Sequence, residues 1–119
     1  MSETAQTPQP WMERTQLLFG EERQRELMRC HVLIVGLGGV GGMAAELIAR
    51  AGIGRLTIVD ADIVQPSNIN RQIVATADSI GRPKAEVLAE RLRSINPAIE
   101  LEVVEAFLKD EVMTEVLDR

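Results

Sequence analysis

The chain has 119 residues, a length that predicts a single domain or part of one, and its 45% hydrophobic and 26% charged residues are ordinary for a globular protein. No apolar run approaches the roughly 20 residues that cross a bilayer. The first residues also lack the apolar core of a signal peptide, so we expect a cytoplasmic protein without membrane contact. A net charge of −5 excludes a global basic surface for nucleic acid, and the single cysteine excludes an intrachain disulfide.

Polar and short helical segments precede the first predicted strand. Residues 1–10 contain two prolines and are expected to form a flexible arm. The following stretch, 11–30, predicts one or two short helices that break near Gly20. Cys30, at the end of this stretch, is expected to be a small buried residue with a structural role.

From residue 31 onwards, predicted strands and helices alternate. The apolar run 31–36 is typical of a strand that is buried on both faces of a parallel sheet. The helix predicted at 39–52 carries Leu47, Ile48 and Ala51 at helical spacing. The remaining predicted elements are, in chain order, a strand at 55–60, a helix at 83–96, a strand at 99–107 and a helix from 109.

This order predicts an α/β fold of the Rossmann-like, doubly wound type with a mainly parallel sheet. Three strands form only half of such a sheet. We therefore expect 11–119 to be the N-terminal, nucleotide-binding portion of a larger domain that continues beyond this chain.

A glycine-rich loop joins the first predicted strand to the next helix. Gly36, Gly38 and Gly41 fit the pattern G-x-G-x-x-G, and Gly39 lies within it. Glycines let the backbone approach a phosphate closely, and the helix N-terminus offers N–H groups to an anion. The spacing is compatible with NAD(P), FAD or ATP. In the alternative interpretation, the glycines only pack the helix against the strand.

An acidic residue ends the second predicted strand, where a carboxylate can hydrogen-bond a ribose hydroxyl. Asp60 lies 19 residues after Gly41, and Asp62 follows as a second candidate for nucleotide contact. The alternative is that Asp60 is only a solvated strand end.

Cationic and amide side chains after Asp62 favour a triphosphate. Asn68, Arg71 and Gln72 lie in one polar loop, and Lys84 begins the next predicted helix. A hydride-transfer enzyme has no need for cations here, whereas phosphate oxygens bind the arginine fork and the lysine ammonium. Arg71 and Lys84 are thus catalytic candidates that could stabilise a phosphoryl transition state. The alternatives are a surface charge or salt bridge for Arg71 and a solvated first-turn residue for Lys84.

Three segments carry a resemblance to a known family: "VLIVGLGGVGG", "GIGRLTIVDADIVQPSNINRQ" and "GRPKAEVLAERLRSINP". They resemble the ThiF/MoeB/HesA family, relatives of the ubiquitin-activating enzymes, from about Arg14 to Phe107. The resemblance implies a homodimeric enzyme that binds ATP with Mg²⁺ and adenylates a carboxylate, releasing pyrophosphate. Two alternatives from other classes are an NAD(P)-dependent oxidoreductase and a non-catalytic interaction domain.

The resemblance also implies roles for individual residues. Asn68, Arg71 and Lys84 would contact phosphates, and Asp60 would bind the ribose. Gln72 would orient the loop beside Arg71. An N-terminal arginine, here Arg14, would reach the ATP site of the partner subunit as a third catalytic candidate. The phosphate loop would comprise Gly36, Gly38, Gly39 and Gly41.

Within the family, "NINRQI" and "ERTQLLFGEE" are most similar to the tRNA threonylcarbamoyladenosine dehydratase branch. That branch implies tRNA as partner and a carboxylate that is activated and then cyclises. The alternative partner is a ubiquitin-like sulfur-carrier protein. The metal-binding aspartate of the family would lie beyond this chain, so we assign no metal ligand and expect the 119 residues alone to be inactive.

Overall fold

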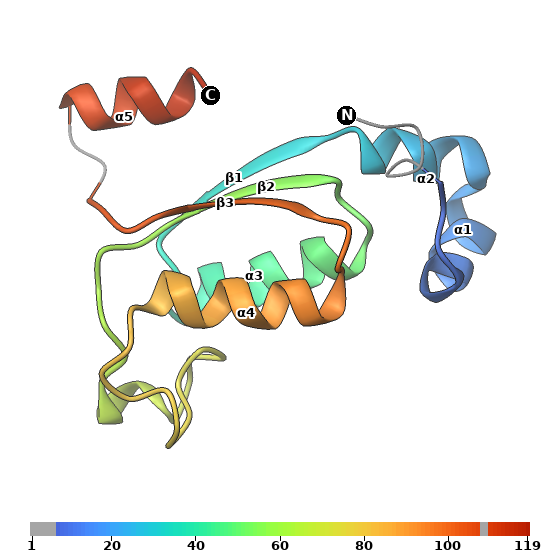
Figure 1. The fold of residues 1–119 in the computed structure, drawn as a ribbon. Helices are drawn as coiled ribbons and strands as arrows, with labels where there is room; N and C mark the ends of the chain where they lie inside the picture. The colour runs from blue at the N-terminus through green and yellow to red at the C-terminus, as the bar shows by residue number, and fades with distance from the viewer. Residues whose placement is uncertain (1–6, 108–109) are drawn as a thin grey trace.

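The computed structural model describes residues 7–107 and 110–119, and a parallel sheet of three strands forms its centre. β1 (His31–Val35), β2 (Arg55–Val59) and β3 (Glu100–Val104) lie in that order, and β2 pairs with both neighbours from its first residue to its last. The three strands therefore end together at one edge of the sheet (Figure 1).

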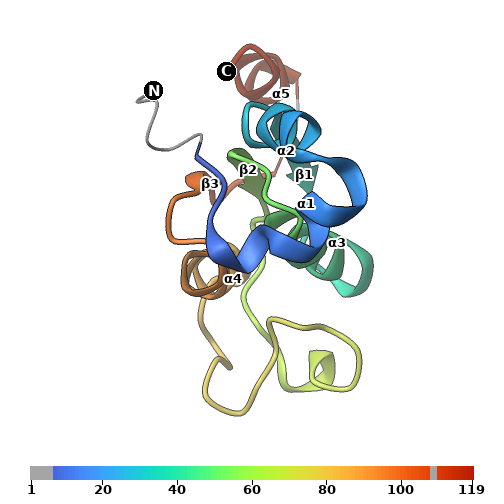
Figure 2. The ribbon, with the colours of Figure 1, turned by 90° about the vertical axis from the view of Figure 1, so that its right-hand side faces the viewer.

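Two helices cover one face of the sheet (Figures 1 and 2). α3 (Gly39–Arg50) joins β1 to β2, and α4 (Lys84–Ile95) joins β2 to β3. This arrangement confirms the predicted α/β fold with a parallel sheet. The core fills the space between helices and sheet and includes Ala45, Ala49, Leu56, Ile58, Leu88 and Leu92. Of the helices in the described part, none is long and apolar enough to cross a membrane.

The N-terminal segment packs at the amino end of the strands. It forms η2 (Pro10–Met12), α1 (Glu13–Phe19) and α2 (Glu21–Met28). Gly20 separates α1 from α2 with φ 89°, which confirms the predicted break. Of the arm expected at 1–10, residues 1–6 lie outside the described part.

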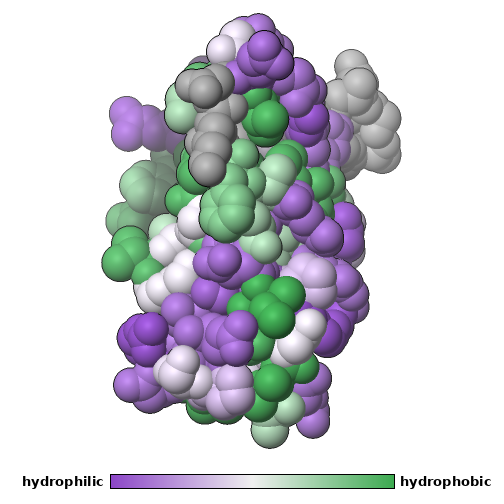
Figure 3. Space-filling view, turned by 90° about the vertical axis from the view of Figure 1, so that its left-hand side faces the viewer, coloured by the Kyte–Doolittle hydropathy of each residue, from purple (hydrophilic) through white to green (hydrophobic). Residues whose placement is uncertain are grey.

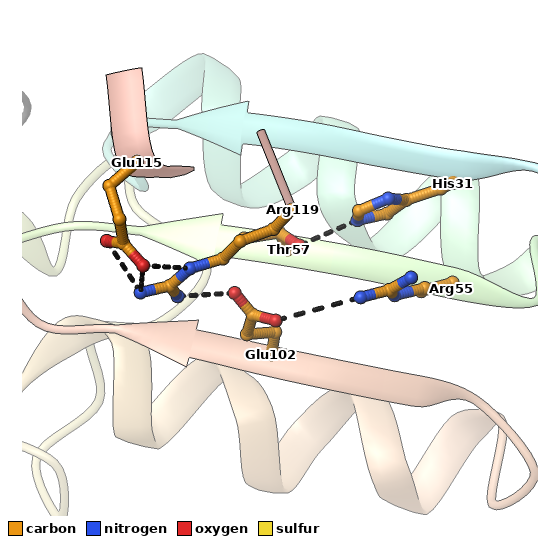
Figure 4. A network of polar contacts seen from close by, with 6 residues as sticks. All are labelled: His31, Arg55, Thr57, Glu102, Glu115 and Arg119. Carbon is orange, nitrogen blue, oxygen red and sulfur yellow. Dashed lines mark hydrogen bonds and ion pairs between the residues drawn. The ribbon is translucent and has the colours of Figure 1, made fainter. Parts of the chain in front are cut away.

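The opposite face of the sheet carries a polar network beneath α5 (Asp110–Leu117). His31 Nε2 lies 2.7 Å from Thr57 Oγ1, and Arg119 pairs with Glu102 and with Glu115 (Figure 4). Nearer the carboxyl end, this face becomes apolar. Val116 of α5 packs there against Val59 and Val104.

Three expectations about burial and strand length are wrong. β1 is not buried on both faces, since only central β2 has a strand on each side and β1 is half-buried with exposed ends. Cys30 is exposed because it lies in the turn between α2 and β1, where its thiol donates to the carbonyl oxygen of Glu26 at 3.3 Å. β3 ends at Val104, and the predicted strand to 107 is too long.

On α3, the residues that are buried also differ from those that the sequence pattern indicates. Ala45 and Ala49 are fully buried, while Leu47 is exposed. Small side chains let α3 lie close to the sheet, so the alanines and not the leucine form its contact face.

Candidate functional site

Two adjoining hollows lie at the carboxyl end of the sheet, the end that faces the viewer in Figure 3. Ala61, Asp62 and Phe107 line both of them. The lining of the first, which we call the apolar hollow, also includes Val35, Gly36, Val59, Asp60 and Ala106. The lining of the second, the polar hollow, also includes Ile63, Gln65, Asn68 and Lys84.

The glycine loop begins where β1 ends. Gly36 has φ 85°, and its N–H donates to the carbonyl oxygen of Val59 at 2.8 Å. A Cβ on Gly41 would lie 1.7 Å from the carbonyl oxygen of Gly36. The turn therefore closes only with glycine at 41, and close packing accounts for this part of the motif without a ligand.

Gly38 and Gly39 have more space around them than Gly41 has. A Cβ on Gly38 would meet the side-chain amide of Gln72 at 3.5 Å, and one on Gly39 would lie 3.8 Å from the carbonyl oxygen of Arg71, both ordinary contacts. The structure thus brings the polar loop alongside the glycine loop. Gln72 is buried there, and its Oε1 has no hydrogen-bond partner among the residues that the structure describes. The first-turn N–H groups of α3 have no partner within the helix, as at any helix start.

Asp60 joins the glycine loop to the turn after β2. Its Oδ2 accepts the N–H of Leu37 at 2.7 Å, and its Oδ1 accepts the N–H of Asp62 at 2.7 Å. Asp60 is therefore more than a solvated strand end. Each carboxylate oxygen has a further lone pair, so these two bonds still leave Asp60 able to accept from a ligand hydroxyl.

Asn68 and Lys84 lie together in the lining of the polar hollow, and both are 7% exposed. Asn68 Oδ1 accepts the N–H of Gln65 at 2.8 Å, and its side-chain NH₂ is a donor. Lys84 is the first residue of α4, and its backbone N–H donates to the carbonyl oxygen of Asp62 at 3.0 Å.

The burial of Lys84 rules out the interpretation of a solvated first-turn residue. Within residues 7–107 and 110–119, no carboxylate forms an ion pair with its ammonium group. A cation at the N-terminus of a helix is repelled by the helix dipole, so the position of Lys84 favours a nearby negative charge. The polar hollow is therefore suited to an anion.

The two candidate arginines lie apart from the hollows. Arg71 is exposed, and its Nη1 donates to the carbonyl oxygen of Ser67 and to Asn70 Oδ1, both at 3.0 Å. Arg14 is exposed on α1, at the amino end of the sheet. The 12 residues of α3 separate the glycine loop from that end, about 18 Å at 1.5 Å per residue. This distance is too great for Arg14 to reach the hollows of its own chain.

Seven lining residues were not predicted from the sequence: Val35, Val59, Ala61, Ile63, Gln65, Ala106 and Phe107. A signal for Phe107 was present, because ligands of open α/β sheets bind beyond the carboxyl ends of the strands. The predicted third strand extended to residue 107, so Phe107 was not recognised as a residue beyond the strand end. As for metal ligands, the described part of the chain contains no group of three or more His, Cys, Asp or Glu side chains that could hold an ion.

The parallel strands, the helices that connect them and the glycine turn after β1 define a Rossmann-like α/β architecture. A family model described as the ThiF family matches residues 12–119. The chain belongs to the ThiF family.

Individual relatives agree with this assignment. The chain is 46% identical over 101 residues to the tRNA threonylcarbamoyladenosine dehydratase of Escherichia coli, covering 82% of this chain and 38% of that protein. It is 41% identical over 99 residues to the molybdopterin-synthase adenylyltransferase of Salmonella typhimurium, covering 83% of this chain and 40% of that protein.

Among solved structures, the E. coli tRNA N6-threonylcarbamoyladenosine dehydratase in complex with ATP superimposes with a TM-score of 0.87 at 42% identity. The match covers 90% of this chain and 44% of that one. The chain therefore spans less than half the length of each of these relatives.

Proposed function

We propose that this chain is the ATP-binding portion of an enzyme that activates a carboxylate by adenylation. The observation that carries the proposal is the position of Lys84, which lines the polar hollow, is 7% exposed and has no carboxylate partner in the described structure. A triphosphate supplies the missing negative charge. A nicotinamide cofactor has its pyrophosphate held by the glycine loop and leaves Lys84 without a role.

Different residues of the site bind different parts of ATP. Lys84 and the side-chain NH₂ of Asn68 hold phosphate oxygens in the polar hollow, and the first-turn N–H groups of α3 hold others. Asp60 binds the ribose, and Arg71 turns from its own loop towards the phosphates. Bound ATP, with Mg²⁺, supplies a leaving group: a carboxylate oxygen bonds to the α-phosphorus, and pyrophosphate departs.

The proposed substrate is the carboxylate of N6-threonylcarbamoyladenosine in tRNA, which then cyclises with loss of water. The identity to named dehydratases supports this choice. Related adenylyltransferases of sulfur-carrier proteins support a ubiquitin-like carrier protein as the second candidate. Pyrophosphate release that depends on modified tRNA selects the first, and release that depends on a carrier protein selects the second. A tRNA substrate would place the reaction in the cytoplasm.

We further propose that the enzyme is a homodimer and that Arg14 acts in the partner's site. The distance between α1 and the hollows of the same chain supports action across a dimer. The 119 residues by themselves are proposed to be inactive, since they span only 38% and 40% of two of the enzymes that they match.

A pair of substitutions on α4 tests the proposal in the full-length protein. Lys84→Met removes the buried charge and keeps the length of the side chain, and exposed Arg93→Met on the same helix is the matched control. Titration calorimetry with Mg·ATP should give roughly tenfold or greater weakening for Lys84→Met and no change for Arg93→Met. Without ATP, Lys84→Met should melt at the same or a higher temperature, because it removes a cation that repels the helix dipole and breaks no ion pair of the described part.

The opposite pattern contradicts the proposal. If the wild-type protein binds NADH and not ATP, the adenylation hypothesis is wrong. If Lys84→Met binds Mg·ATP as tightly as the wild type, Lys84 is not a phosphate ligand.

A further inference from the structure

Phe107 lies at the carboxyl end of the sheet and, with Ala61 and Asp62, lines both hollows. The chain has three aromatic residues, one tryptophan and two phenylalanines. Trp11 and Phe19 belong to the N-terminal helical segment, at the amino end of the sheet. Phe107 is therefore the one aromatic side chain of the described part that lines either hollow.

The two hollows differ in chemistry on either side of this ring. The polar hollow offers Lys84 and the amides of Gln65 and Asn68. The apolar hollow offers the aliphatic side chains of Val35 and Val59, with Asp60 at its edge. A triphosphate fits the first lining, whereas the flat, weakly polar face of a nucleobase fits the second.

The ring is accessible and its backbone is anchored. Phe107 is 62% exposed. Its neighbour Ala106 packs against the cluster of Val59, Val104 and Val116, which ties the segment both to the sheet and to α5. Single exposed apolar residues are common on protein surfaces, so exposure alone would carry little weight. Phe107 differs from such residues because it is aromatic, lines both hollows and follows a packed residue.

We propose that Phe107 determines nucleoside recognition in this site by stacking on the base of the bound nucleotide. This inference rests on the proposed function. It adds a residue that recognises the nucleobase, whereas Lys84 and Asn68 recognise only the phosphates. Aromatic stacking acts on the π-face that every base has, and a purine offers a larger face than a pyrimidine. Phe107 should therefore favour purine over pyrimidine nucleotides and should not distinguish ATP from GTP.

The test compares ligands that share phosphates and differ in the base. Mg·ATP, Mg·CTP and Mg²⁺ with inorganic tripolyphosphate are titrated calorimetrically into the full-length wild-type protein and the Phe107→Ala and Phe107→Trp variants. Phe19→Ala, which removes the other phenylalanine at the amino end of the sheet, is the matched control. Phe107→Ala should weaken ATP roughly tenfold or more, weaken CTP less, and leave tripolyphosphate unchanged.

The conservative variant adds a spectroscopic signature. Phe107→Trp should bind ATP as tightly as the wild type does, in contrast to Phe107→Ala. ATP should quench the fluorescence of the introduced indole, whereas tripolyphosphate should leave it unchanged. Phe19→Ala should bind all three ligands as the wild type does. A merely structural role of Phe107 would instead weaken all three ligands alike.

The outcomes separate this inference from the proposed function. If the wild type binds ATP and Phe107→Ala binds it equally well, stacking is wrong and the adenylation proposal stands. Equal losses for ATP and tripolyphosphate in Phe107→Ala also overturn stacking. If the wild type binds no ATP, the proposed function itself fails.

Discussion

At the amino end of the sheet, protein atoms fill the space beside the glycines, whereas at the carboxyl end part of that space stays open. A Cβ on Gly54, between α3 and β2, would lie 1.7 Å from the carbonyl oxygen of Met28. A Cβ on Gly39, at the start of α3, would meet nothing closer than the carbonyl oxygen of Arg71 at 3.8 Å. The first glycine lets α2 dock, and the second is not required by the packing of the chain.

Each end has a buried glutamine whose Oε1 has no hydrogen-bond partner in the described part, Gln24 at the amino end and Gln72 at the carboxyl end. Gln24 of α2 is fully buried, and its Nε2 donates to the carbonyl oxygen of Ala51 at 3.1 Å. That hydrogen bond joins two parts of the protein. Lys84, at the carboxyl end, has no ion-pair partner in the described part. The comparison indicates that close packing accounts for the glycine at the amino end, whereas the open part of the carboxyl end is available to the proposed nucleotide.

The largest effect is expected at Gly54. Gly54→Ala forces the backbone of Met28 away from the loop before β2, so the N-terminal helices lose their contact with the core. We expect the free energy of unfolding of the full-length protein to fall by about 3 kcal/mol, measured by chemical denaturation. A loss below half of that value would show that the chain tolerates a side chain at position 54. The proposed difference in packing between the two ends of the sheet would then be wrong.

A smaller and qualitatively different effect is expected at Gly39. Gly39→Ala adds a methyl group within the first turn of α3, where alanine is the better helix former by roughly 0.5–1 kcal/mol. The melting temperature should stay the same or rise, while calorimetry should show Mg·ATP binding weakened about tenfold, or 1.4 kcal/mol. Unchanged ATP affinity together with a lower melting temperature would reverse the roles assigned to Gly39 and Gly54.

The smallest effect is expected in the helix layer that joins the two ends. Glu46 of α3 pairs with Arg91 of α4 and with Arg50, at 3.4 Å from Nε to Oε2 for the latter. The hydrogen bond from Arg91 is the main cause that lowers the pKa of Glu46, against the opposing effect of burial. Glu46→Gln should reduce the free energy of unfolding at pH 7 by about 1 kcal/mol.

The pH dependence of that effect follows from the direction of the shift. Because folding lowers the pKa of Glu46, its charge stabilises the fold fully above the ordinary glutamate pKa of about 4.3. That stabilisation disappears as the pH falls through the lowered value. Denaturation curves of wild type and Glu46→Gln should therefore converge in acid. Exposed Glu86→Gln, which removes a surface pair with Arg82, is the control and should change stability little at either pH.

Much of the fold could be predicted, because local patterns determine strands and helices. The apolar run before Gly36, the break at Gly20 and the helix that follows Pro83 all lie where the sequence indicates them. Errors arose where burial depends on neighbours. The exposure of Cys30 and the incomplete burial of β1 follow from which elements cover them, and no local pattern records that.

In the candidate site, the residue types were likewise predictable from the sequence, whereas their contacts were not. The motifs identified Asp60, Asn68 and Lys84, and the structure brings all three to the carboxyl end of the sheet. The hydrogen bonds that make Asp60 a link between two loops were not predictable, because Leu37 lies 23 residues away. Arg71 does not line the hollows, since its guanidinium bonds to its own loop.

The sequence by itself determined the alternation of strands and helices, the family and the residue types at the site, since each depends on short segments. Only the tertiary structure decided which glycines close the fold, that Lys84 is buried without an ion pair, and that Phe107 lies between two hollows. Those properties depend on contacts between distant parts of the chain, which form only when the parallel strands end side by side.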